Sequence, residues 1–396
     1  MIYLDHAATT PMDPQVIEVV RQSMEAEFAN SGTVYRLGLD AKMKIDRAIE
    51  EIREILGIPG THRIIFTSGG SESNNLFIKG LCFPDKKTAC LGLEHPSIAS
   101  ALGYLKAFSN DPVCLRSFQK EGRMDLQAVP VLNDQRVRLL CLSHVNNETG
   151  AVNDPLILLE ALEKQSPQTR LYLDGVQGVG KLALSPGMWS RLAGYALSAH
   201  KINGPKGIGI LIFDSRLSLT PQIHGGKQQY GIRSGTLPTP LILGLTEALR
   251  LSVARQKTTL EHFGELRRHL VEKLKYLSHR EANLKLRFNS HLSDDARLQS
   301  PAIVNFSFPP VEGEVLLHHL EERGIYVGLG SACSAYSKEP SKILTGIGLS
   351  EEEARCSLRI SFGGENTLED IDRFVSEFFI AFQSLYPSFF QNSSER

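Results

Sequence analysis

One stretch decides the fold of this 396-residue chain: SAHKINGPKGIG, residues 198–209. It predicts the end of one buried strand, a short polar turn that carries Lys201, and a Gly-rich run into a second apolar strand at residues 210–213. A lysine between two packed strands keeps a fixed position, and a partly desolvated amine loses its proton readily and becomes nucleophilic. A lone loop lysine is more often solvated. The surrounding residues therefore decide between a reactive and a solvated amine.

Those surrounding residues favour the reactive amine. Ser198 and His200 flank Lys201 with hydrogen-bonding groups, and an apolar strand upstream, residues 171–173 (LYL), ends at Asp174. Pyridoxal phosphate needs such a pair, because a lysine forms a Schiff base with its aldehyde and an acid holds its pyridinium nitrogen. We therefore expect pyridoxal phosphate as the cofactor, bound between Lys201 and Asp174.

Strand, polar loop and helix alternate through residue 213. Apolar strands are predicted at residues 64–67, 89–93 and 137–142, and helical patterns follow the first two of them. This alternation predicts an α/β fold with a large, mostly parallel sheet and helices on both faces. Ligands bind beyond the strand ends in such sheets, and polar clusters fall there at Gly70, His95, Asn147, Asp174 and Lys201.

The length of the chain predicts two domains. Helical patterns occur at residues 14–28 and 41–56, and a long helical region at about 240–277 would bridge the domains. The remainder alternates short strands and helices in an α+β pattern, ending with a helix from Leu368. We predict a large cofactor-binding α/β domain of residues 14–255, and a small α+β domain formed by residues 1–13 and 256–396.

Composition argues against several classes of function. The formal net charge of −1 gives no sign of direct nucleic-acid or membrane-surface binding, and no apolar run is long enough to span a bilayer. The first residues, MIYLD, lack the pattern of a signal peptide, so a cytoplasmic location is expected. The six cysteines lie far apart without a CxxC pair, which argues against a metal site and a disulfide framework.

Nine motifs are spread along nearly the whole chain: YLDHAATTPMDP, FTSGGSESNN, LEHPSI, SHVNNETGAV, LDGVQGVGKL, SAHKINGPKGIG, GIRSGTLP, GSACSA and RISFG. In this order they resemble the cysteine desulfurases, which are pyridoxal-phosphate enzymes of fold type I in the class V aminotransferase superfamily. The resemblance implies an enzyme that converts L-cysteine to L-alanine and passes the sulfur to an acceptor.

The resemblance also implies a role for single residues around the cofactor. Lys201 is the expected Schiff-base lysine, Asp174 the partner of the pyridinium nitrogen, and His95 the residue that stacks on the ring and shuttles protons. Thr236 would reach the phosphate of the neighbouring subunit, so the resemblance implies a homodimer. The other expected contacts are Gln177 at the ring hydroxyl, Gly70, Ser71, Ser198 and His200 around the phosphate, and Asn147 beside cofactor and substrate.

Two further residues are expected to act on the substrate. Arg359 resembles the residue that binds the carboxylate of L-cysteine, a task that suits a bidentate guanidinium, although an arginine at a strand end is usually surface charge. Cys333 lies in the run GLGSACSA, residues 328–335, whose side chains are too small to hold a loop by packing. Its thiolate is expected to travel to the substrate and to receive the sulfur as a persulfide. A nearby positive charge, such as protonated His95, would assist.

Other readings of the cysteines and of the reaction stay open. Cys90 and Cys141 lie inside apolar strands and are expected to be inert core thiols, and Cys333 could also be structural. The resemblance to long-loop desulfurases implies an iron-sulfur scaffold or a tRNA-thiolation relay protein as the sulfur acceptor. Alternative functions are selenocysteine lyase, another class V aminotransferase activity, and a catalytically silent scaffold or binding partner. The chain departs from the family at residues 31–35 (SGTVY) and at Gly364-Glu365.

Overall fold

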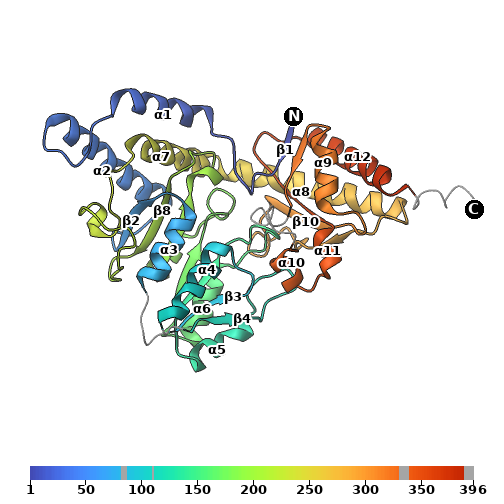
Figure 1. Cartoon of the computed structure of the whole chain (residues 1–396), viewed down its shortest axis with the longest axis horizontal. Helices are drawn as coiled ribbons and strands as arrows, with labels where there is room; N and C mark the ends of the chain where they lie inside the picture. Colours follow the sequence, from blue (N-terminus) through green and yellow to red (C-terminus); the bar gives the residue numbers. More distant parts are fainter. Residues whose placement is uncertain (82–86, 109–110, 330–338, 388–396) are drawn as a thin grey trace, which may run out of the picture.

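The computed structural model describes residues 1–81, 87–108, 111–329 and 339–387. Within these ranges the largest element is a seven-stranded sheet with the order β2-β8-β7-β6-β5-β3-β4 (Figure 1). Strand β8 is antiparallel to both of its neighbours, and the other neighbouring strands are parallel. The predicted large, mostly parallel sheet is confirmed. Its strands are β2 (His62–Thr67), β3 (Lys87–Leu91), β4 (Val113–Leu115), β5 (Val137–Ser143), β6 (Arg170–Asp174), β7 (Gly194–Ser198) and β8 (Gly209–Asp214).

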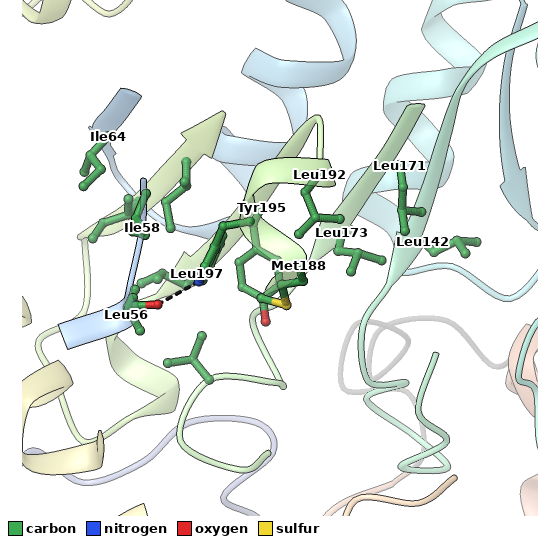
Figure 2. Close-up of a cluster of buried hydrophobic side chains, with 14 of the residues drawn as sticks. Leu56, Ile58, Ile64, Leu142, Leu171, Leu173, Met188, Leu192, Tyr195 and Leu197 are labelled. Carbon is green, nitrogen blue, oxygen red and sulfur yellow. Dashed lines mark hydrogen bonds between the residues drawn. The ribbon is translucent and has the colours of Figure 1, made fainter. Parts of the chain in front are cut away.

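Both faces of this sheet are buried. Successive side chains of a strand point to opposite faces, and in β6 Leu171 and Leu173 join one hydrophobic core while Tyr172 joins another. Figure 2 shows the first core, where Leu56 accepts a hydrogen bond of 2.7 Å at its carbonyl oxygen from the indole of Trp189. In the second core the ring of Tyr172 stacks on Phe77. A sheet with two buried faces explains why its strands are continuously apolar in the sequence.

Helices cover each face, as the alternation predicts. The core drawn in Figure 2 also takes side chains from α1 (Pro14–Ala26), α2 (Arg36–Leu56), α5 (Val129–Asp134), α6 (Pro155–Gln165) and α7 (Thr239–Ala254). The opposite core takes side chains from α3 (Gly70–Gly80) and α4 (Pro96–Leu105). Local sequence fixes several helix ends. Asp13 and Asp154 cap helices whose first residue is proline, and Gly57 ends α2 in the left-handed conformation.

A second, smaller sheet has its own hydrophobic core. Strands β12 (Ser357–Ser361), β10 (Ile303–Ser307) and β9 (Arg287–Phe288) pair antiparallel. Helices α8 (Gln256–Arg280), α9 (Gly313–Glu321) and α12 (Leu368–Leu385) pack on one another beside it (Figure 1). The short helices α10 (Lys342–Gly346) and α11 (Glu351–Arg355) pack with Leu93, which lies in the turn after β3 of the large sheet. The domain division at residues 13/14 and 255/256 stays a prediction.

The N-terminal segment reaches both parts of the molecule. Its strand β1 (Ile2–Leu4) pairs in parallel with β11 (Ile325–Val327). A few residues later, the backbone nitrogen atoms of Thr10 and Asp13 donate to the carbonyl oxygens of His200 and Asn203. The segment therefore joins the small core to the turn that carries Lys201.

The helical region predicted at 240–277 is two helices, not one. The helix is interrupted at Arg255, which lies between the last residue of α7 and the first residue of α8. No glycine or proline marks this break in the sequence, so the continuous helical pattern hid it. Among the described residues, no helix combines the length and the hydropathy that crossing a membrane requires.

Candidate active site

A cavity of about 580 Å³ opens beyond the carboxyl ends of the parallel strands. Ser143, Asp174 and Ser198 are the last residues of β5, β6 and β7, so three neighbouring strands deliver polar groups to one edge of the sheet. The cavity is lined by most of the site residues predicted from the sequence, namely Gly70, Ser71, His95, Asn147, Asp174, Gln177, Ser198, His200, Lys201 and Arg359.

Lys201 lies at the end of a short 3-10 turn, residues Ala199–Lys201, directly after β7. Its Nζ donates to the carbonyl oxygens of Ala7 and Ala8 at 2.5 Å each. The carbonyl oxygen of His200 accepts from Thr10 Oγ1 at 2.9 Å. The polar turn between two buried strands is confirmed, and the N-terminal segment holds its lysine. The sequence could not reveal these acceptors, because backbone carbonyls carry no side-chain signal.

Asp174 is 7% exposed, and its carboxylate is held on both oxygens. Asn74 Nδ2 donates to Oδ2 at 2.7 Å, and the backbone nitrogen of Val176 donates to Oδ1 at 3.0 Å. Tyr172 in turn donates to the amide oxygen of Asn74 at 2.7 Å. Asn74 was not among the predicted residues. Its signal is its place four residues after Gly70 in α3, which puts both on the same face of that helix.

His95 caps the first turn of α4. Its Nδ1 accepts from the backbone nitrogen of Ser97 at 3.1 Å, so the proton of the neutral ring is assigned to Nε2. Burial lowers the pKa of His95, the charge of Lys201 lowers it further, and Asp174 acts in the opposite direction. The expectation that a protonated His95 assists the thiolate is therefore not favoured, because burial disfavours the charged ring.

The site has a crowded backbone where α3 begins. Gly69 has a φ of +153°, and a Cβ on Gly209 would lie 2.6 Å from the Cα of Gly69. Only glycine permits the turn before α3 to lie directly against β8. This places Gly70 and Ser71, the first residues of α3, beside Ser198. Free backbone N–H groups at a helix start attract anions.

Arg359 is buried inside the protein rather than lying on its surface. Its side chain is 1% exposed, with Nη2 donating to Asp5 Oδ1 at 2.6 Å and Nη1 to the carbonyl oxygen of Asn147 at 2.9 Å. Within the described residues its Nε has no hydrogen-bond partner. A buried N–H without an acceptor is costly. A guanidinium with such a donor beside the cavity suits a carboxylate ligand.

Two buried carboxyl groups of the cavity were missed by sequence reasoning. Burial raises the pKa of Glu94 to about 8 and that of Glu148 to about 7. Glu94 accepts from Ser143 Oγ at 2.6 Å, and Glu148 accepts from Ser341 Oγ at 2.5 Å. Glu94 follows β3 and lies in the motif LEHPSI, and Glu148 follows β5 and lies in the motif SHVNNETGAV. Their positions shortly after a strand end are the signal that could have identified them.

The remaining predictions for the site have different outcomes. Thr236 is exposed and does not line this cavity, and Cys333 lies outside the described residues. Cys90 and Cys141 are buried, and burial raises the pKa of each thiol, which confirms that they are core residues. No cluster of three or more metal-ligating side chains occurs in the ranges that the structure describes.

Comparison with known proteins places this fold and site in a family. The aminotransferase class-V family matches residues 2–374. A cysteine desulfurase IscS from Vibrio vulnificus is 34% identical over 395 residues, covering 97% of this chain and 93% of the relative. A cysteine desulfurase IscS from Dictyoglomus turgidum is 32% identical over 375 residues, covering 94% and 92%.

Solved structures agree with these sequence matches. A NifS-like protein superposes with a TM-score of 0.85 at 27% identity, covering 95% of this chain and 98% of the other. A NifS-like protein from Rickettsia africae gives 0.83 at 28% identity, covering 97% and 99%. The chain therefore belongs to the aminotransferase class-V family. Within that family its relatives include cysteine desulfurases, and the resemblance inferred from the motifs is confirmed.

Proposed function

We propose that this protein is a pyridoxal-phosphate-dependent cysteine desulfurase, which converts L-cysteine to L-alanine and transfers the sulfur to Cys333 as a persulfide. The observation that carries the proposal is one cavity that brings together Lys201, Asp174 and the buried Arg359. Cysteine desulfurases among the relatives of this chain support the same reaction.

The residues of the cavity fit pyridoxal phosphate. Lys201 offers the amine for covalent attachment, and the carboxylate of Asp174 offers a partner for a ring N–H. The start of α3 offers N–H groups for a phosphate, with Ser71 and Ser198 beside it. When bound, the cofactor withdraws electrons from the substrate Cα. These donors and acceptors are the ones that an anionic phosphate and a protonated pyridine ring require.

Three residues of the chain then act on the substrate in different ways. Arg359 holds the carboxylate of cysteine through the guanidinium hydrogens that its bonds to Asp5 and Asn147 leave unused. Lys201 removes the proton at Cα. The thiolate of Cys333 bonds to the substrate sulfur as the Cβ–S bond breaks, and the electron pair of that bond stays on the carbon skeleton, which takes up protons and leaves as alanine. Of the other cysteines, burial raises the pKa of Cys356 to about 11, which disfavours a thiolate there.

We infer that the functional unit is a homodimer in which Thr236 completes the phosphate site of the partner subunit. Thr236 is exposed in the single chain. Large apolar side chains are also exposed along residues 28–43, among them Phe28 at 79% and Val34 at 89%. Contiguous exposed apolar residues usually mark an interaction surface. The cytoplasmic location and the acceptor, an iron-sulfur scaffold or a tRNA-thiolation relay protein, stay predictions.

The reaction is tested by product analysis with purified protein. With pyridoxal phosphate, L-cysteine and a reductant, equal amounts of alanine and sulfide are expected. Lys201→Ala should fold but lose the visible absorbance of the bound cofactor and all turnover. If Lys201→Ala formed as much alanine and sulfide as wild type, this result would contradict the role assigned to the lysine. Preference for selenocysteine, transfer of the amino group, or no turnover would point to the alternative functions.

The role of Cys333 is tested by intact-protein mass spectrometry after cysteine treatment. Wild type should gain one sulfur at Cys333, and Cys333→Ala should gain none and release no sulfide, although it still binds the cofactor. Cys114→Ala is the matched control, because Cys114 is an exposed thiol elsewhere on the molecule. Normal turnover by Cys333→Ala would remove the persulfide step from the proposal.

A further inference from the structure

A second buried lysine contacts the cavity only through another residue. Lys181 is 6% exposed and lines a separate, smaller cavity of about 130 Å³. Its Nζ donates to Gln177 Oε1 at 2.6 Å, and Gln177 Nε2 donates to the carbonyl oxygen of Ala7 at 2.7 Å. Ala7 is also an acceptor of Lys201 Nζ. These contacts form a continuous chain from Lys181 to Lys201.

The two contacts of Gln177 fix which way its amide points. A carbonyl oxygen only accepts hydrogen bonds, and a lysine amine can donate one whether or not it carries the extra proton. The amide oxygen must therefore face Lys181, and the amide nitrogen must face Ala7. In the part of the chain that the structure describes, Ala7 takes one of the two hydrogens on Nε2. The second hydrogen is left for a ligand in the cavity that Gln177 lines.

The amine of Lys181 is held in an unfavourable place. Burial lowers its pKa to about 7, and the positive charges of Lys201 and Arg359 act in the same direction. Among the described residues, His6 also interacts with Lys181; it is 1% exposed, and burial lowers its pKa to about 4, so at neutral pH it carries no charge. An amine buried among cations costs folding free energy. A methionine of similar length would avoid this cost, so packing alone does not account for a lysine here.

We propose that Lys181 is a positioning residue for the cofactor: it holds the amide of Gln177 so that Nε2, and not Oε1, faces the ring hydroxyl oxygen of pyridoxal phosphate. The inference rests on the proposed function, since it concerns the same cavity. With the cofactor bound, this ring oxygen would carry negative charge, and Gln177 Nε2 would supply an N–H donor to it. An N–H donor stabilises that anion, whereas a flipped amide would place an oxygen against it.

The test follows the bound cofactor instead of turnover. In wild type and Lys181→Met, the visible absorbance is titrated with pH, and pyridoxal phosphate is titrated into the apoprotein. Loss of the N–H donor should raise the midpoint pH of the absorbance change by about one unit and weaken cofactor binding about tenfold. Lys181→Arg keeps a charged donor and should restore most of both values. Lys164→Met, at an exposed lysine of α6, is the matched control and should match wild type.

A double-mutant cycle separates positioning from direct action of the charge. Gln177→Met should show the same shift as Lys181→Met, and the double variant should show little more, because Lys181 acts through Gln177. Shifts that add in full, or a wild-type midpoint and affinity in Lys181→Met, would overturn the inference. Far-ultraviolet circular dichroism checks folding, and Lys181→Gln replaces Lys181→Met if the latter does not fold. Wild-type protein without any cofactor band would instead refute the proposed function itself.

Discussion

Arg359 shows at the scale of one residue how a buried charge is oriented by its partners. Its ion pair with Asp5 and its bond to Asn147 orient the guanidinium, while its Nε stays without a partner among the described residues. An ammonium group in its place would keep the charge but lose the planar fork. The geometry of the guanidinium, more than its charge, should therefore matter for the substrate.

Arg359→Lys is predicted to raise KM for cysteine about 10- to 100-fold, because a charge-assisted hydrogen bond contributes about 1.5–3 kcal/mol. The loss should fall mainly on KM, since the carboxylate is bound in both the ground state and the transition state. Steady-state kinetics measure both constants. Arg250→Lys, at an exposed position of α7, is the control. An unchanged KM in Arg359→Lys would show that another residue binds the carboxylate.

Glu148 gives a prediction about pH. Burial raises its pKa from 4.5 to about 7, against the opposing effects of the Ser341 hydrogen bond and the charge of Arg359. The folded state therefore binds the proton more tightly than the unfolded state does. The resulting stability is fully present below about pH 4.5 and is lost as the pH rises to about 7. The loss is on the order of 3 kcal/mol.

Glu148→Gln should remove this part of the pH dependence, because an amide does not titrate but can still accept from Ser341. Denaturant unfolding of the apoprotein at about pH 5 and about pH 8 measures the free energy of unfolding. The difference between the two pH values should be smaller in Glu148→Gln than in wild type. Glu160→Gln, on an exposed carboxylate of α6, is expected to behave as wild type. Parallel profiles for all three proteins would mean that Glu148 is ionised at both pH values.

At the scale of elements, Gly209 of β8 lies against Gly69 before α3, at the end of the cavity where we propose that phosphate binds. A Cβ on Gly209 would also lie 2.7 Å from the carbonyl oxygen of Leu197. All of these neighbours are backbone atoms, which cannot move aside as a flexible side chain would. The strand, the turn and the start of α3 therefore have to shift together when Gly209 is changed.

Gly209→Ala is predicted to lower the free energy of unfolding by about 1–3 kcal/mol and to weaken cofactor binding. Thermal unfolding and cofactor titration measure the two effects. Gly103→Ala is the matched control: no atom lies within 4 Å of a Cβ there, and Gly103 is in α4. Alanine at that helical position should stabilise the protein by about 0.5–1 kcal/mol. If Gly209→Ala and Gly103→Ala had the same free energy of unfolding, the close backbone contact at Gly209 would not affect stability.

Most elements could be predicted because their sequence periods are strong. The apolar strands and the helix that ends at Gly57 appear where the patterns place them. The break at Arg255 could not be predicted, since this residue keeps helical dihedral angles and no helix-breaking residue occurs there. Strand order and the antiparallel direction of β8 depend on long-range pairing that local periodicity does not contain.

The candidate site was predicted as far as side-chain chemistry and family motifs reach. Lys201, Asp174 and His95 are recognisable by residue type and by their places at strand ends. The carbonyl oxygens of Ala7 and Ala8 were missed, because any residue supplies a carbonyl. Asn74 and Lys181 were missed because each contacts a residue of the cavity lining, Asp174 or Gln177, and only the folded chain shows that contact.

For the whole molecule, the exposed apolar segment at residues 28–43 is the feature that a single chain leaves unexplained. Val34→Asp is predicted to give monomers with reduced cofactor occupancy, because a charge opposes burial in an interface and the partner's Thr236 would be lost from each site. Sedimentation velocity measures the mass, and absorbance at the same time measures the cofactor. Tyr276→Asp, at a residue of α8 that is 66% exposed, is the control. A fully loaded Val34→Asp monomer would refute the shared site.

The ion pair between Asp5 and Arg359 joins residues 354 positions apart in the sequence. A ribosome makes Asp5 and Lys201 before it makes Arg359. Lys201 Nζ donates to the carbonyl oxygens of Ala7 and Ala8. The segment that carries these two residues is held in place by the pairing of β1 with β11, which is made after Lys201. An incomplete chain therefore contains the reactive lysine but not the finished site. We therefore expect that fragments ending before β12 do not retain the proposed cofactor.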